Sequence, residues 1–149
     1  MPSVYGGGSS GVTAATQAEM ETATATDVAA TPGRTQYHPG VAKAWAHFNG
    51  TGTAALTVSH NISSLTDHTT GDHTLNFTTA FSSANFCVVA GGNFQESGTT
   101  STVGGIVTVS ARATPRATGS CRLACSSAGI ATSTLADFPS VYAAFYGDQ

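Results

Sequence analysis

The sequence predicts an all-β domain, an antiparallel β-sandwich or jelly-roll-like fold, preceded by an extended N-terminal anchor that contains a short helix. From Val41 onward, apolar residues recur with a period of two, which is the pattern of half-buried strands. Clusters of Gly, Pro, Ser, Thr and Asp separate these segments at short intervals. Before Val41 this alternation is missing, so we expect an anchor and linker over residues 1–40 and a β-domain over residues 41–149.

The N-terminal part contains a Gly- and Ser-rich run. Residues 1–15 carry too little apolar surface to become ordered alone. Gln17–Ala23 predicts a short helix, because Thr16 and Glu19 have the spacing of a capping box. This helix has almost no apolar stripe, so we expect it to depend on neighbouring chains for stability. Two prolines and two glycines within residues 31–40 then predict a turn without helix.

The β-domain is expected to contain about seven or eight short strands. The alternating segments are Ala44–Phe48, Ala54–Ser59, Thr74–Thr78, Val103–Ala111 and Val141–Tyr146. Phe86–Ala90 is apolar throughout, which is typical of a strand buried on both faces. The predicted turns are Thr66–Asp72, Gly91–Ser101, Ala113–Ser120 and Ala136–Pro139.

The composition argues against several classes of partner. Charged residues make up 9% of the chain, against about 25% in typical globular domains. The five basic residues are scattered and the net charge is −3, whereas nucleic-acid binding requires clustered cations. Apolar runs fall short of the roughly 18 residues of a membrane span, and the N-terminus lacks the pattern of a signal peptide. We therefore expect no nucleic-acid or membrane partner, and synthesis in a cytoplasm.

The sequence predicts no metal site and no cofactor. Cys87, Cys121 and Cys125 do not form the two close pairs of a zinc site, so we expect free thiols that are buried or half-buried. One histidine per chain on a trimer axis could bind a metal, but nothing in the sequence singles one out. We interpret the candidates as ordinary strand histidines: His38, His47 and His60.

Catalysis is not expected either. The sequence contains no common nucleophile or phosphate-binding motif. Glycan cleavage requires two carboxylates that face each other in a groove, whereas the acidic residues after Val41 lie mostly in predicted turns. We therefore expect that the protein is not an enzyme and has no catalytic residues.

Two features within the β-domain have competing interpretations. Asp67, His68, Asp72 and His73 cluster where a tight hairpin turn is predicted, and we expect solvent-facing histidines there rather than metal ligands. Trp45 is the only tryptophan. We expect it to pack in the core or between subunits, the alternative being an exposed platform for a sugar.

Three stretches resemble bacteriophage tail-fibre and related virion fibre proteins. Residues 15–34 (ATQAEME, ATD and TPGR) resemble a module that reads ATQAExxxGTDxxxxVTPxxL, where three chains wind together. Residues 38–80 (HPGVAKAWAHFNGTGT, then NISSLTDHTTGDHTLNF) are similar to C-terminal fibre domains that read HPxxAKAWxxFxGTGT and NVSSITDNGTGDYTVNF. The ending Val141–Gln149 is also similar. Residues 91–140 match nothing in the pattern, and His68 and His73 replace its usual Asn and Tyr.

The resemblance implies a structural component of a bacteriophage virion, a short tail fibre or spike, made in the host bacterial cytoplasm. It implies a homotrimer that presents its β-domain for host-surface attachment. The N-terminus would dock to other virion proteins through Val4, Tyr5, Gly6, Gly7 and Gly8. The alternatives are a head fibre, a capsid decoration protein or an adaptor without receptor binding, and, in another class, a carbohydrate-binding module.

Three loops are expected to bind host-surface glycan weakly and without cleaving it. Thr66–His73, Asn93–Thr102 and Ala113–Thr118 are the longest turn-rich stretches, and binding residues concentrate on loops held by a rigid scaffold. The candidate ligand-binding residues are Asp67, His68, Asp72, His73, Gln95, Glu96 and Arg116.

Overall fold

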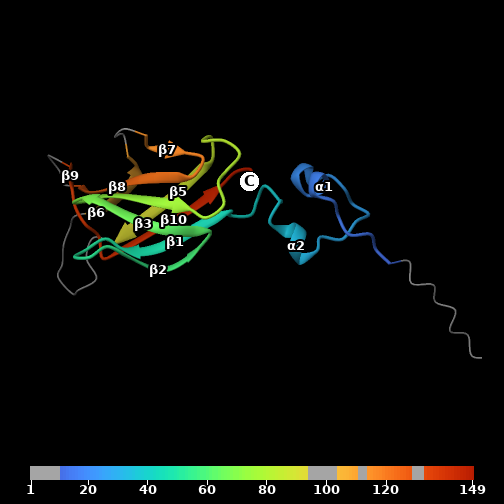
Figure 1. The fold of residues 1–149 in the computed structure, drawn as a ribbon, viewed down its shortest axis with the longest axis horizontal. Coiled ribbons are helices and arrows are strands. Elements are labelled where there is room, and N and C mark those ends of the chain that lie inside the picture. The colour runs from blue at the N-terminus through green and yellow to red at the C-terminus, as the bar shows by residue number, and fades with distance from the viewer. Residues whose placement is uncertain (1–10, 94–103, 111–113, 129–132) are drawn as a thin grey trace, which may run out of the picture. The chain divides into compact units, whose positions relative to one another are not determined.

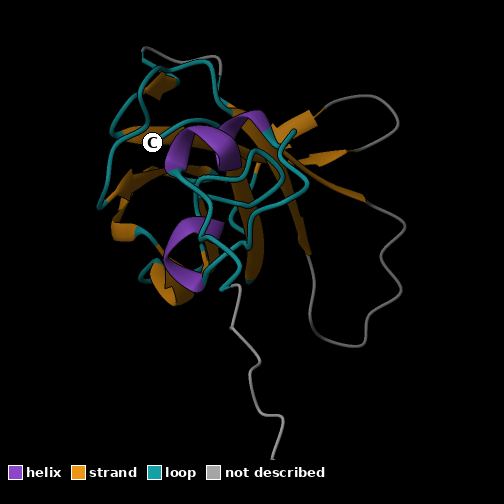
Figure 2. Cartoon of the chain, turned by 90° about the vertical axis from the view of Figure 1, so that its right-hand side faces the viewer, coloured by secondary structure: helices purple, strands orange, loops and turns teal. Residues whose placement is uncertain are grey.

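The chain forms two compact units, Met1–Val41 and Ala42–Gln149, in a computed structural model that describes residues 11–93, 104–110, 114–128 and 133–149. Helices are confined to the described part of the first unit and strands to the second (Figures 1 and 2). None of the helices that the structure describes is long and apolar enough to cross a membrane.

The first unit contains the predicted capped helix. Helix α1 (Gln17–Thr22) begins after Thr16, whose side chain accepts a hydrogen bond from the Glu19 amide, while the Glu19 carboxylate accepts one from the Thr16 amide. This capping box confirms the sequence prediction. A second short helix, α2 (Pro32–Thr35), lies where only a turn was expected. That expectation is wrong because a proline fits the first turn of a helix, where its missing N–H costs no hydrogen bond.

The second unit consists of two antiparallel sheets, which confirms the all-β prediction. The first sheet has the order β2 (Ala55–His60), β1 (Ala44–Asn49), β10 (Ser140–Tyr146) and β5 (Cys87–Asn93). The second has the order β3 (Ile62–Thr69), β4 (Asp72–Phe77), β8 (Ser120–Ala128) and β6 (Gly104–Val109). Two short strands, β7 (Arg116–Ala117) and β9 (Ser133–Leu135), also pair with β8. The last strand, β10, thus lies between β1 and β5 (Figure 1).

Inward side chains of both sheets form one hydrophobic core. Its largest side chains are aromatic, and four of them form a cluster of edge-to-face and tilted ring pairs with centroids 4.7–5.9 Å apart: Phe77, Phe81, Phe86 and Phe145. Such geometry is favoured between aromatic rings. Small inward residues, Ala44 and Ala46 on β1 and Ala143 on β10, accommodate these rings. Because successive residues of a strand point to opposite faces, the residues of β1 and β10 that lie between these inward residues face away from the core.

The structure contains ten strands in its described residues, more than the seven or eight expected, and it departs from the predicted strands in several places. Strand β5 is not buried on both faces, because Val89 is 59% exposed. The predicted turn at Thr66–Asp72 is wrong, because β3 continues to Thr69 and only a short turn precedes β4. Strand β8 was not predicted, because its inward residues include Cys121 and Cys125, which serve here as small apolar side chains.

Candidate functional site

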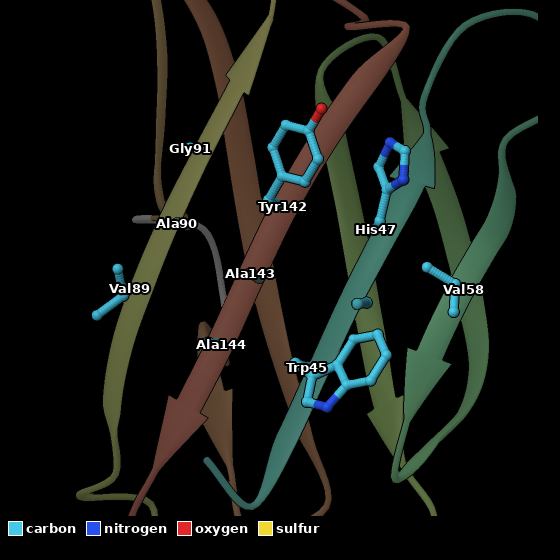
Figure 3. A pocket seen from close by; sticks show the side chains of 10 residues that line it. Trp45, His47, Val58, Val89, Ala90, Gly91, Tyr142, Ala143 and Ala144 are labelled. Carbon is cyan, nitrogen blue, oxygen red and sulfur yellow. The ribbon is translucent and has the colours of Figure 1, made fainter. Parts of the chain in front are cut away.

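The outer face of the sheet β2–β1–β10–β5 carries most of the large hydrophobic side chains that are exposed among the described residues. Six large hydrophobic side chains are exposed in the described part of the chain. Four of them lie on this face: Trp45 (38%), Val58 (50%), Val89 (59%) and Tyr142 (50%). The period of two explains their position, because β1 and β10 direct Ala and Phe residues into the core and the intervening residues outward. We call this surface the ring face (Figure 3).

The strand register arranges the ring face in two rows. In the first row, Trp45 lies opposite His60 on one side and Ala144 on the other, and Ala144 lies opposite Val89. In the second row, four residues follow in the order Val58, His47, Tyr142 and Gly91. Each row therefore combines aromatic rings on the central strands with a small residue beside them.

The aromatic rings of the face form two stacked pairs. The rings of Trp45 and His60 have centroids 6.3 Å apart and an interplanar angle of 23°. Those of His47 and Tyr142 are 4.6 Å apart at 19°. Cross-strand pairs of this kind stabilise a sheet and limit the rotamers that each ring can adopt.

A hydrogen-bond chain fixes the second pair. The Ser140 hydroxyl, which is almost fully buried, donates to the Tyr142 oxygen over 2.6 Å, and His47 Nε2 lies 2.9 Å from the Ser140 oxygen. If Ser140 donates to Tyr142, its oxygen can accept from the Nε2–H tautomer of His47. The phenol proton of Tyr142 then remains available to donate to a ligand.

The ring face contains a groove of about 650 Å³, within the usual range of small-molecule sites. Trp45, His47, Val58, Val89 and Tyr142 surround it, and small residues of β10 and β5 lie between them: Ala90, Gly91, Ala143 and Ala144. None of the lining residues that the structure describes is Asp, Glu, Lys or Arg. The site can therefore bind an uncharged ligand by ring contacts and hydrogen bonds.

Trp45 does not lie in the core, so that part of the expectation is wrong. Its side chain lies on the ring face because it is out of phase with the inward Ala44 and Ala46. Its packing between subunits stays a prediction.

The ligand-binding residues predicted from the loops do not come together on the ring face. Asp72 is buried and forms two hydrogen bonds of 2.7 Å with the guanidinium of Arg122, which raises the pKa of Arg122. Asp67, His68 and Arg116 are exposed, and none of them lines the groove. Gln95 and Glu96, like the predicted anchoring residues Val4–Gly8, lie outside the described residues.

His73 is fully buried, so the expected solvent-facing position is wrong for this residue. It shares the inward face of β4 with Leu75 and Phe77, and its ring lies 5.3 Å from that of Phe48. Its Nε2 is 3.8 Å from Asp67 Oδ1 and 4.0 Å from Asp137 Oδ1, and neither ring nitrogen has a hydrogen-bond partner. Within the described residues, no group of three His, Cys, Asp or Glu side chains could hold a metal ion.

The cysteines are free, and two of them are buried as expected. Burial raises the pKa of the Cys121 and Cys125 thiols to about 12. Cys87 is exposed, which contradicts the expectation for that residue.

No protein-family model, curated protein or solved structure matches the chain. The candidate site is therefore defined by the geometry of the ring face.

Proposed function

We propose that the protein is a structural attachment component of a bacteriophage virion, a short fibre or spike whose β-domain binds the host surface without catalysis. The observation that carries the proposal is the ring face, a groove lined by exposed aromatic and aliphatic side chains with no charged residue among its described lining. The motifs of residues 15–34 and 38–80, which resemble virion fibre proteins, support the virion as its location.

The ring face has the properties of a binding surface. Soluble proteins rarely expose large contiguous apolar patches unless these contact a partner or ligand. Binding energy is also concentrated in aromatic side chains that are held in place before binding. The stacked ring pairs and the His47–Ser140–Tyr142 chain provide such an arrangement.

A homotrimer is part of the proposal. Helix α1 has only six residues, and isolated helices shorter than about 12 residues are marginal in water. Met20 is the only buried residue of this helix in the described chain, so neighbouring chains would supply most of its support. Three copies of a weak site would raise the avidity of the fibre by orders of magnitude.

Adsorption to host cells tests the proposal. Purified full-length protein should bind cells and compete with the parent phage for adsorption. The variant W45A should lose most of this competition, because it removes the largest ring of the ring face. The matched control is I106A, because Ile106 is 43% exposed on β6 in the other sheet.

Two results would overturn the proposal. If the wild-type protein neither binds cells nor slows adsorption, the protein is a capsid decoration or adaptor without a receptor. If W45A and I106A compete equally with the wild type, attachment does not use the ring face.

A further inference from the structure

We infer that the ligand of the ring face is a neutral saccharide, whose sugar rings stack on Trp45 and Tyr142. This inference rests on the proposed function and specifies the chemical class of the receptor. It replaces the predicted acidic and basic loop residues with an uncharged aromatic site as the point of contact.

The orientation of the rings is the first argument. On the outer face of the sheet, the rings of Trp45 and Tyr142 are uncovered (Figure 3), and because one face of the Tyr142 ring stacks on His47, its other face is directed toward Gly91. The face of an aromatic ring carries the negative part of its quadrupole, which attracts the weakly positive C–H groups on one side of a pyranose. The two rings come from neighbouring strands and adjacent rows, so one oligosaccharide could contact both.

Small residues beside the two rings leave open space on the ring face. Ala144 lies next to Trp45, and Gly91 lies next to Tyr142. A Cβ atom added to Gly91 would meet no other atom within 4 Å, so the space over this residue is open. A sugar ring can therefore approach the side of Tyr142 without displacing a side chain.

The polar groups of the groove supply the third argument. The phenol proton of Tyr142 can donate to a sugar hydroxyl, and the imidazole of His47, which also lines the groove, stacks on the Tyr142 ring. An acidic saccharide would require a cation to compensate its charge, and the described lining residues include no Lys or Arg. The site therefore suits a ligand with hydroxyl groups and no net charge.

A second copy of the chain is the competing occupant of this face. Stable protein interfaces bury about 800 Å² on each partner and match in shape over that area. A second copy would have to place side chains in the open groove of about 650 Å³ to match the ring face in shape. The groove thus favours a small ligand over a flat subunit contact.

Intrinsic fluorescence offers a direct test, because Trp45 is the only tryptophan in the chain. Full-length protein should be titrated with neutral di- and trisaccharides of glucose, galactose, mannose, rhamnose and N-acetylhexosamines, with sialyllactose as the acidic probe. At least one neutral saccharide should change the emission of Trp45 saturably, with a dissociation constant in about the millimolar range. Sialyllactose should bind at least about tenfold more weakly.

Two variants locate the binding. G91V should fold, because a Cβ atom there enters open space, and should weaken the saccharide response by about tenfold or more, because the valine occupies the space beside Tyr142. Y142A should weaken binding by about tenfold or more, whereas I106A should leave it unchanged.

The outcomes separate the ligand class from the proposed function. If no neutral saccharide binds but W45A still loses adsorption, the ligand class is wrong and the proposed function stands. If W45A or G91V instead changes the oligomeric mass in light scattering, the occupant is a second copy and the inference is overturned. If the protein binds a neutral saccharide but does not bind host cells, the inference about the ligand stands and the proposed function in host attachment is wrong.

Discussion

Trp45 has a position that a stability measurement can distinguish from core packing. Truncation of a buried tryptophan to alanine costs about 3–5 kcal/mol. Because 38% of Trp45 is exposed on the ring face, W45A should lower the free energy of unfolding by only about 1–2 kcal/mol. Urea unfolding followed by circular dichroism measures this difference, and a loss above about 3 kcal/mol would show that the residue is buried in the native assembly.

The buried cysteines predict a pH dependence of stability. Burial raises the pKa of Cys121 and Cys125 from 9.0 to about 12, so the folded protein favours the neutral thiols. The stability that the two buried thiols contribute is fully present below pH 9, because there the thiols are neutral in both the folded and the unfolded state. Between about pH 9 and 12 the unfolded thiols ionise first, so stability should fall by about 1 kcal/mol per pH unit for each thiol.

Alkylation by iodoacetamide gives an independent reading of the same burial. In the native protein at pH 8, only Cys87 should react, because it is the exposed cysteine and the thiolate is the reactive form. Cys121 and Cys125 should react only after denaturation. Mass spectrometry that found three labels on the native protein would contradict their burial.

At the scale of an element, β5 contains neighbouring glycines with opposite surroundings. A Cβ atom on Gly91 would enter the open groove, whereas one on Gly92 would lie 2.7 Å from Cδ2 of Phe138. G91V should therefore leave the melting temperature nearly unchanged, and G92V should lower it markedly because it overpacks the core. Thermal unfolding of both variants tests this, and equal stability of the two would show that β5 is oriented differently.

The sequence allowed some elements to be predicted and concealed others. Alternation in Ala44–Phe48 and Val141–Tyr146 was sufficient for β1 and β10, because their inward residues are apolar and their outward residues are larger or polar. The sequence predicts a turn over Thr66–Asp72 where β3 continues to Thr69, because the outward residues of β3 are polar and only Ile62 and Leu65 pack against the core. Hydrophobic periodicity cannot detect a strand that is supported on one side by so few apolar groups.

The period of two predicts which face of a strand a residue lies on, but the candidate site also requires knowledge of which strands pair. Alternation set Trp45 and His47 on one face of their strand and Tyr142 on one face of another, although the sequence prediction for Trp45 was packing in the core or between subunits. Their proximity follows from the pairing of β1 with β10, which are separated by most of the β-domain in sequence. Sequence reasoning instead selected Asp72 and His73 from their chemistry, and these residues are buried.

At the scale of the molecule, the oligomeric state is the first property to measure. Size exclusion with light scattering should give about three times the 14.9 kDa mass of the chain. W45A should give the same mass, because the proposal leaves the ring face free for ligand. A monomer at micromolar concentration would contradict the trimer.

Host attachment through the groove of the ring face can be tested directly on cells. The decisive measurement is flow cytometry of host cells incubated with fluorescently labelled wild-type protein or G91V, after circular dichroism and light scattering have shown that the two share the same fold and mass. We predict that the wild type labels the cells and that G91V does not, because valine fills the open space over Gly91. Equal labelling by both proteins would show that host attachment does not involve the groove.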